Sequence, residues 1–310
     1  MWRAEAQFAQ YNSAPMLILL AYAKVNLALD VVRQREDGNH DLDSLLVPID
    51  WHDLVGLTIR PAETTRINIR VTGRATEGVP SGDDNLAARA AGALQRLVAI
   101  PLEIGVWLEK RVPHGAGLGG GSADAAAVLH AGKQLLTAFG IALTKEHLLN
   151  AALGVGSDVP ALVARTPVRV GGCGDALTSV VMQPLHLAVV MTAPSSTAAV
   201  FTALTREEKL SDGRVGRLID SLNAGPPPDE LMGSTLENAA VRVNPTLGRL
   251  FEAIRTLHPG HMWHMTGTGG ALFTVTRDAS DADELAAGLR RTGFVARAVR
   301  TVSDPAAVSQ

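Results

Sequence analysis

The segment that most restricts how this chain can fold is residues 115–121, where five of seven residues are glycine. Glycine in regular structure costs roughly 0.5–1 kcal/mol relative to alanine, so such a run is tolerated where the backbone turns tightly or approaches a ligand closely. A strand pattern precedes the run at residues 102–108, and an alanine-rich helix pattern follows it at residues 122–139. Because the first N–H groups of a helix lack partners and its dipole is positive there, the sequence predicts a phosphate-binding loop.

Other interpretations of the glycine run remain open from the residues alone. The run could be a plain connection with Ser122 as the N-cap of the helix. Gly115, Gly117 and Gly120 also satisfy the G-x-G-x-x-G pattern of a dinucleotide site, which would suit a nicotinamide-dependent oxidoreductase. The acidic residue expected ~20 residues later is missing. A Walker A loop is excluded, since no Gly-Lys-Ser/Thr follows.

The remaining patterns mix strands and helices. Strands are predicted at residues 16–32, 54–59, 65–71, 102–108, 168–170, 188–192, 272–275 and 294–298. Helices are predicted at residues 86–98, 122–139, 144–153, 235–257 and 282–292. Strict βαβ alternation is absent, so the expected class is α+β. We expect an N-terminal extension at residues 1–15, a first domain at 16–170 and a second at 171–310.

Composition restricts the possible partners and compartment. The chain of 310 residues has a net charge of -3, which gives no electrostatic reason to expect nucleic acid or an anionic membrane as a partner. Its single cysteine, Cys173, cannot form an intrachain disulfide, which fits a reducing cytoplasm. No stretch approaches the ~20 apolar residues of a membrane span. We expect a cytoplasmic protein, monomeric or homodimeric, that acts on small molecules.

Two charged residues are candidates for chemistry. Lys24 lies on the strand face opposite Val25 and Leu27. Burying a lysine is costly without a partner, and Asp158 would be a natural one. Lys24 could instead be a solvated edge lysine. Asp158 precedes Pro160, so from the residues alone it is either a helix N-cap or a base.

Three segments together resemble the GHMP kinase superfamily. Residues 117–126 resemble its phosphate loop, residues 156–160 resemble the segment with the catalytic aspartate, and residues 266–271 resemble its third, glycine-rich motif. The resemblance implies ATP-dependent phosphorylation of a small molecule. It also implies a two-domain fold, with an N-terminal domain like domain 2 of ribosomal protein S5 and a ferredoxin-like C-terminal domain.

Four further segments narrow the resemblance: residues 23–27, 37–40, 84–86 and 110–113. They are similar to GHMP kinases that phosphorylate the 2-hydroxyl of 4-diphosphocytidyl-2-C-methyl-D-erythritol, a step of non-mevalonate isoprenoid synthesis. The resemblance covers about residues 22–300. A kinase for another alcohol, such as homoserine or mevalonate, and an inactive nucleotide-binding module are the alternatives.

The resemblance also implies roles for individual residues. Asp158 would accept the proton of the substrate hydroxyl, with Lys24 beside it. The ATP site would comprise Asn85, Leu86, Lys110, Pro113, Gly115, Gly117, Leu118, Gly119, Gly120, Gly121 and Ser122. The substrate site would comprise Asn26, His40, Thr197, Phe201, Gly267, Thr268 and Gly269. Mg²⁺ is expected on the nucleotide, held by phosphates and water, with Ser122 as a possible ligand.

The chain departs from the family pattern at two positions. Asn39 stands where these kinases usually carry a tyrosine associated with stacking on cytosine. Asparagine does not stack, so base recognition is expected to depend on His40 and Phe201. His114 replaces a residue that is usually small or apolar.

Overall fold

Two β-sheets organise the protein. The computed structural model describes residues 15–205, 207–209, 211–222 and 225–302. The larger sheet has strand order β3-β4-β2-β1-β8, and β5 pairs with β2 and with β6. The smaller sheet has the order β11-β7-β10-β9. Most pairs are antiparallel, so the expected α+β class is confirmed and a doubly wound parallel sheet is not formed.

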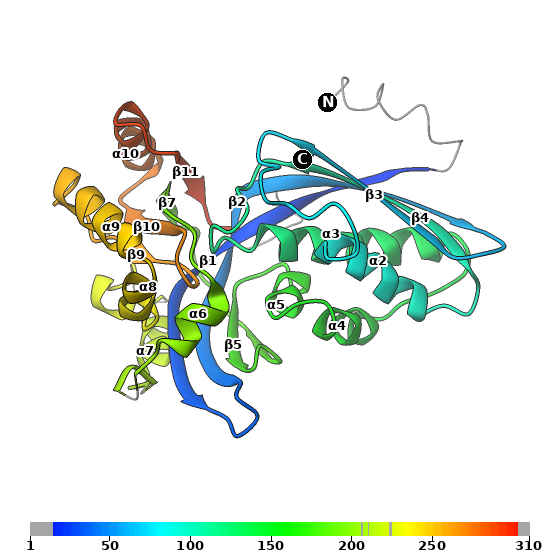
Figure 1. Ribbon diagram of the computed structural model, residues 1–310, viewed down its shortest axis with the longest axis horizontal. Helices are drawn as coiled ribbons and strands as arrows, with labels where there is room; N and C mark the ends of the chain where they lie inside the picture. The colour runs from blue at the N-terminus through cyan, green and yellow to red at the C-terminus, as the bar shows by residue number, and fades with distance from the viewer. Residues whose placement is uncertain (1–14, 206, 210, 223–224, 303–310) are drawn as a thin grey trace.

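The first half of the chain builds the larger sheet and its helices. Helices cover one face of this sheet (Figure 1). Its elements are β1 (Leu17–Gln34), β2 (His40–Pro61), β3 (Arg66–Gly73), α2 (Leu86–Arg96), β4 (Leu102–Lys110), α3 (Gly120–Thr137), α4 (Lys145–Leu153), α5 (Val159–Val163), β5 (Val168–Gly172) and β6 (Ala176–Ser179).

The second half of the chain builds the smaller sheet, at the left of Figure 1. Its elements are β7 (His186–Met191), α6 (Thr197–Thr202), η1 (Glu207–Lys209), α7 (Arg214–Ser221), η2 (Asp229–Leu231), β8 (Gly233–Ser234), α8 (Glu237–Val243), α9 (Pro245–Leu257), β9 (His264–Met265), β10 (Ala271–Thr276), α10 (Ala279–Arg291) and β11 (Ala296–Arg300). β8 pairs with β1, so this half also contributes to the larger sheet.

The core follows the apolar alternation of the strands. Leu102, Ile104, Val106 and Leu108 of β4 are all buried, as their period of two predicts, and they pack with alanines of α2 and α3. A second apolar cluster joins β1 and β2 to β7, β10 and α7. The two sheets are therefore connected through a shared core as well as through the chain.

The largest differences between the predicted elements and the structure occur at two places. The strand predicted at residues 54–59 is only the last part of β2, which begins at His40; Asp41, Asp43 and Asp50 break the apolar pattern that would have shown it. The helix predicted at residues 235–257 is two helices. Asn244 is the N-cap of α9 and Pro245 its first residue, and a proline cannot supply the N–H that a continuous helix needs.

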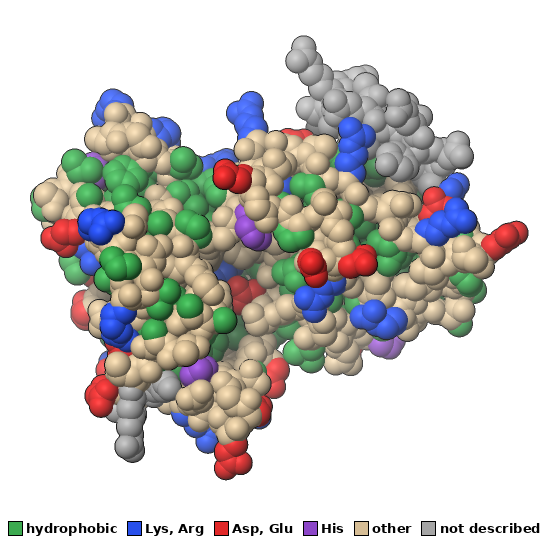
Figure 2. Space-filling model, in the orientation of Figure 1, with side chains coloured by type: hydrophobic (Ala, Val, Ile, Leu, Met, Phe, Trp, Pro, Cys, Tyr) green, Lys and Arg blue, Asp and Glu red, His purple; other side chains and the backbone are tan. Residues whose placement is uncertain are grey.

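Charged side chains are mixed over the visible face. Figure 2 shows basic and acidic groups interspersed, with a depression between the left and right parts of the molecule. No helix in the described ranges is both long and apolar enough to cross a bilayer.

Candidate active site

The glycine loop joins β4 to α3. Gly115, Gly117 and Gly119 have φ values of 72°, 70° and 66°, a left-handed conformation that favours glycine. The helix begins at Gly120, with Gly119 as its N-cap, so the prediction of a helix that starts at Ser122 was wrong by two residues. Ser122 therefore lies inside the first turn and does not cap the helix. The first N–H groups of α3, which directly follow the loop, have no acceptor within the helix.

A cavity of about 230 Å³ lies against the loop. His114 and the connection between β3 and α2 also line it. Of the residues predicted to hold ATP, the cavity is lined by Asn85, Leu86, Lys110, Pro113, Gly115, Gly117, Gly119, Gly120, Gly121 and Ser122. The structure thus brings ten predicted nucleotide residues, from residues 85–86 and 110–122, to one hollow.

Two of the predicted nucleotide residues have little access to this cavity. Leu118 is 1% exposed and its side chain packs in the core, while its carbonyl accepts a hydrogen bond from the N–H of Lys24 at 2.9 Å. The Lys110 side chain is 2% exposed, and its ammonium group binds Asp53 and Asp124. The Lys110 ammonium group is therefore occupied by carboxylates within the cavity wall.

Lys24 lies between the glycine loop and Asp158. Its side chain is buried, and its Nζ donates a hydrogen bond to Asn26 Oδ1 at 2.6 Å. The same Nζ lies 3.4 Å from Asp158 Oδ2, so the predicted pairing of these two residues is confirmed and the solvated-lysine alternative is wrong. A β-bulge between Tyr22 and Lys24 interrupts the β1–β2 register, and bulges of this kind redirect side chains next to active sites.

Asp158 occupies the N-cap position of α5 without capping it. Its carboxylate makes no side-chain hydrogen bond to the helix start, although Pro160 follows in the first turn. The side chain is 39% exposed, in contrast to the buried Lys24. The carboxylate is therefore held by a cation on one side and is open to a ligand on the other.

The third glycine-rich segment packs directly on the glycine loop. A Cβ on Gly117 would lie 2.6 Å from Gly269 O and 2.7 Å from Thr266 O, and a Cβ on Gly270 would lie 2.5 Å from Gly115 O. These contacts between backbones are possible only without side chains. The segment that carries the predicted substrate residues Gly267, Thr268 and Gly269 therefore lies against the glycine loop.

Asn26 is fully engaged within the protein. Its side chain is 4% exposed, accepts from Lys24, and donates to Ser44 Oγ at 2.8 Å. Its backbone N–H donates to Thr266 Oγ1 at 2.9 Å. These contacts orient Lys24 and connect β1 to the third glycine-rich segment.

The other predicted substrate residues form two contacts on α6. Thr197 Oγ1 and Thr268 Oγ1 are 3.1 Å apart. The rings of His40 and Phe201 have centroids 5.0 Å apart with an interplanar angle of 34°. Because α6 carries both Thr197 and Phe201, it connects the third glycine-rich segment to the turn that contains Asn39 and His40. Asn39 is exposed in that turn.

The sequence interpretation assigned no role to Asp124, which lines the cavity, or to Asp53, which binds Lys110 beside it. Both are buried and share the ammonium group of Lys110. Burial raises the pKa of Asp124 to about 8, against the opposing effect of Lys110. The sequence did contain a signal for both residues. Asp53 lies in an apolar strand and Asp124 in an alanine-rich helix, and a carboxylate buried in such a place needs a partner.

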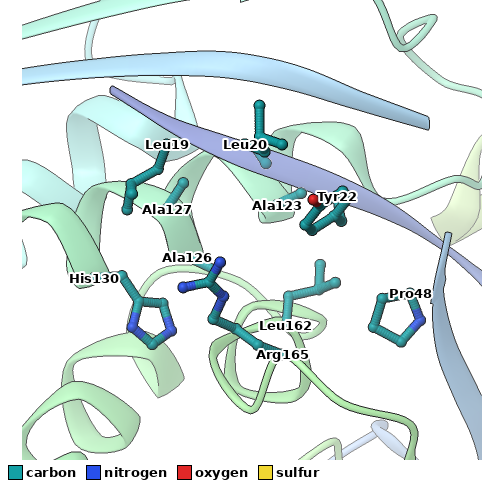
Figure 3. A pocket seen from close by; sticks show the side chains of 11 residues that line it. Leu19, Leu20, Tyr22, Pro48, Ala123, Ala126, Ala127, His130, Leu162 and Arg165 are labelled. Carbon is teal, nitrogen blue, oxygen red and sulfur yellow. The ribbon is translucent and has the colours of Figure 1, made fainter. Parts of the chain in front are cut away.

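A smaller cavity lies on the other side of α3, between β1 and α5 (Figure 3). Its volume of about 20 Å³ suffices for roughly one water molecule. The side chain of Arg165 extends toward Ala126 beside the ring of His130 (Figure 3). Arg165 is the one non-glycine residue with a positive φ, 57°, in the part of the chain described. His130 Nε2 lies 2.9 Å from Val163 O, and burial lowers the pKa of His130 to about 4.

Among known proteins, curated relatives match almost the whole chain. The 4-diphosphocytidyl-2-C-methyl-D-erythritol kinase of Citrifermentans bemidjiense is 36% identical over 292 residues, covering 92% of this chain and 99% of the relative. The enzyme of the same name from Pseudomonas syringae pv. syringae is 33% identical over 288 residues, covering 92% and 95%.

Solved structures share the fold of this chain. A crystal structure of 4-(cytidine 5'-diphospho)-2C-methyl-D-erythritol kinase superposes with a TM-score of 0.75 at 32% identity, covering 93% of this chain and all of that one. A homoserine kinase from Cytophaga hutchinsonii, at 17% identity, shares the fold with a TM-score of 0.65.

A different family model matches a segment in each half of the chain. The GHMP kinases N terminal domain matches residues 85–165, which include the glycine loop and Asp158. The GHMP kinases C terminal domain matches residues 208–294, which include the third glycine-rich segment. With this agreement of motifs, fold and full-length relatives, the chain belongs to the GHMP kinase family.

Proposed function

We propose that this kinase transfers the terminal phosphoryl group of ATP to the 2-hydroxyl of 4-diphosphocytidyl-2-C-methyl-D-erythritol. The observation that carries the proposal is the Lys24–Asp158 pair, placed beside a glycine loop that borders a cavity. The relatives named above, which act on this substrate by their names and match over nearly their whole length, support the choice of alcohol.

Asp158 is the proposed base. Phosphoryl transfer depends mainly on positioning and on stabilising charge, and the attacking hydroxyl must lose a proton. The exposed side of the Asp158 carboxylate accepts that proton, while the Lys24 ammonium group, 3.4 Å away, holds the carboxylate in place. The buried ammonium group of Lys24 also offsets negative charge on the transferred group.

The glycine loop is the proposed binding site for the nucleotide's phosphates. Its backbone approaches Lys24 closely, because a Cβ on Gly119 would lie 2.9 Å from Lys24 Cγ. Phosphates held by the loop and the start of α3 would therefore lie next to the Lys24–Asp158 pair. Ser122, in the first turn of α3, offers a hydroxyl oxygen of the kind that Mg²⁺ accepts. Mg²⁺, when bound with the nucleotide, neutralises phosphate charge.

The cytidine end of the substrate is proposed to lie near His40 and Phe201. These two rings already contact one another, and α6 connects them to Thr268 in the third glycine-rich segment. Asn39 favours a second candidate function, phosphorylation of a different small alcohol, because its side chain offers no ring to stack on a base.

A substrate panel tests the proposal. Purified protein with ATP and Mg²⁺ is assayed for ADP release with 4-diphosphocytidyl-2-C-methyl-D-erythritol, homoserine and mevalonate. Turnover of the cytidyl substrate alone is the expected result. Turnover of another alcohol instead would replace the substrate assignment, and ATP binding without turnover of any alcohol would indicate an inactive module.

A further inference from the structure

Three charged side chains with almost no exposed surface lie together at the nucleotide cavity. Lys110 and Asp124 line the cavity, and Asp53 binds Lys110. Asp53 on β2, Lys110 at the end of β4 and Asp124 on α3 are 0%, 2% and 1% exposed. Lys110 Nζ binds Asp53 and donates to Asp124 Oδ2 at 2.6 Å. Buried charges of this kind are costly unless they are paired, and removing one partner is more costly still. We call these three residues the charge cluster.

The charge cluster connects both ends of the glycine loop to β2, the strand that carries Asp53. Before the loop, Asp53 Oδ1 accepts hydrogen bonds from the backbone N–H groups of Arg111 and Val112 at 2.5 and 2.8 Å. After the loop, Asp124 lies in the second turn of α3 and is held by Lys110. Both segments that flank the loop are therefore bonded to the side chain of Asp53, directly or through Lys110.

The glycine loop itself packs on the cluster. A Cβ on Gly120 would lie 3.1 Å from Val112 Cγ1 and 3.5 Å from Asp53 Oδ2. A run of glycines has many accessible conformations, so binding a nucleotide would cost entropy unless the loop were ordered beforehand. Anchoring the two ends of the loop to one buried group lowers that cost.

We propose that Asp53, Lys110 and Asp124 are positioning residues that hold the glycine loop in its phosphate-binding conformation before the nucleotide arrives. The proposal rests on the proposed nucleotide site and is independent of which alcohol is phosphorylated. It gives Lys110 a different task from the nucleotide contact expected from the family resemblance.

The surroundings of Asp124 show how closely the cluster is enclosed. Burial raises the pKa of this carboxyl, against the opposing effect of the Lys110 ammonium group. Asp124 Oδ1 has no hydrogen-bond partner within the described residues, so this side chain is held through Oδ2 alone.

The first test measures nucleotide affinity and loop order separately. Lys110→Met is titrated calorimetrically with a non-hydrolysable ATP analogue and Mg²⁺, and amide hydrogen exchange of residues 115–122 is followed without nucleotide. We expect a Kd at least tenfold higher, faster exchange in the loop, and a KM for the alcohol within twofold of wild type. Arg60→Met, which removes a surface partner of Glu103, is the matched control. Folded Lys110→Met with wild-type Kd and wild-type loop exchange would overturn the proposal.

A milder variant keeps the test decisive if Lys110→Met does not fold. Asp124→Ala leaves the Lys110–Asp53 pair and removes only the connection to α3. For Asp124→Ala we expect a three- to tenfold higher Kd and faster loop exchange. Asp124→Asn retains an acceptor for Lys110, so its nucleotide affinity should fall less. Equal Kd and exchange in wild type and Asp124→Ala contradict the proposal. Wild-type protein that binds the nucleotide but does not phosphorylate the cytidyl substrate contradicts only the proposed alcohol.

Discussion

Lys24 Nζ lies 3.4 Å from Asp158 Oδ2, although the two residues are 134 positions apart and come from different kinds of element. Lys24 is buried on β1 and also donates to Asn26, whereas Asp158 stands at the start of α5 with 39% of its side chain exposed. The buried Lys24 fixes the position of the Asp158 carboxylate, and the exposed side of Asp158 can reach a substrate. A base and its supporting cation need this arrangement.

Replacing Asp158 tests its role as the base. Asp158→Asn should lower kcat by a factor of roughly 10²–10⁴, because a positioned base contributes about that much. The Kd for a non-hydrolysable ATP analogue should change less than threefold. The melting temperature should fall moderately, because the buried Lys24 ammonium group loses its carboxylate partner and keeps only its hydrogen bond to Asn26. A kcat within threefold of wild type would remove Asp158 from the mechanism.

The contact between the two glycine-rich segments predicts a sharp response at Gly117. Alanine there would adopt a φ of 70°, at a cost of roughly 1–2 kcal/mol, and its Cβ would collide with Gly269 O and Thr266 O. We expect kcat/KM more than tenfold lower and a reduced melting temperature. Gly82→Ala is the control, because nothing lies within 4 Å of its Cβ position. Equal effects of the two substitutions would contradict the contact.

Base recognition is tested at Asn39 and Phe201. Restoring an aromatic ring with Asn39→Tyr should lower the KM for the cytidyl substrate several-fold, because stacking a base on an aromatic side chain contributes roughly 1–3 kcal/mol. Phe201→Ala should raise the same KM, since it removes the ring in contact with His40. Both are measured at saturating ATP. An unchanged KM in both variants would place the base elsewhere.

Backbone strain at Arg165 predicts that the Arg165→Gly variant is more stable than the Arg165→Ala variant. A non-glycine residue in the left-handed region costs roughly 1–2 kcal/mol, and Arg165 has a φ of 57°. Arg165→Gly and Arg165→Ala remove the same side-chain contacts, so their difference isolates the backbone. Denaturant unfolding should find the glycine variant more stable by about 1 kcal/mol. Greater stability of the alanine variant would mean that residue 165 is not left-handed in solution.

His130 predicts a loss of stability in mild acid. Burial lowers the pKa of this imidazole to about 4 from an ordinary 6.5, so the unfolded chain binds a proton that the folded chain excludes. The stabilisation is complete above pH 6.5 and is lost as the pH falls toward 4, by up to about 3 kcal/mol. Urea unfolding at several pH values measures it.

His130→Gln is the matched variant for this pH series. Glutamine does not titrate in this range and can still donate a hydrogen bond to Val163 O, the present partner of His130. Its stability should therefore fall less steeply than that of wild type between pH 6.5 and 4. Parallel curves for the two proteins would show that His130 is not the titrating group.

Local patterns were sufficient for several parts of the site. The glycine run with its following helix, the strand that carries Lys24 and the short helix after Asp158 all follow from backbone preferences and apolar alternation, which act over a few residues. The pairing of Lys24 with Asp158 was also predictable, because a buried ammonium group requires a carboxylate.

The amino-acid sequence by itself determined the glycine loop, the α+β class and the residues whose charge required a partner. Only the tertiary structure decided that Gly117 packs on Thr266 and Gly269, and that Asp53 and Asp124 share Lys110. It also decided that β2 continues through the polar residues before position 54. The physical reason is that local pattern reports which groups must be buried or bonded, whereas their partners are set by the pairing of strands far apart along the chain.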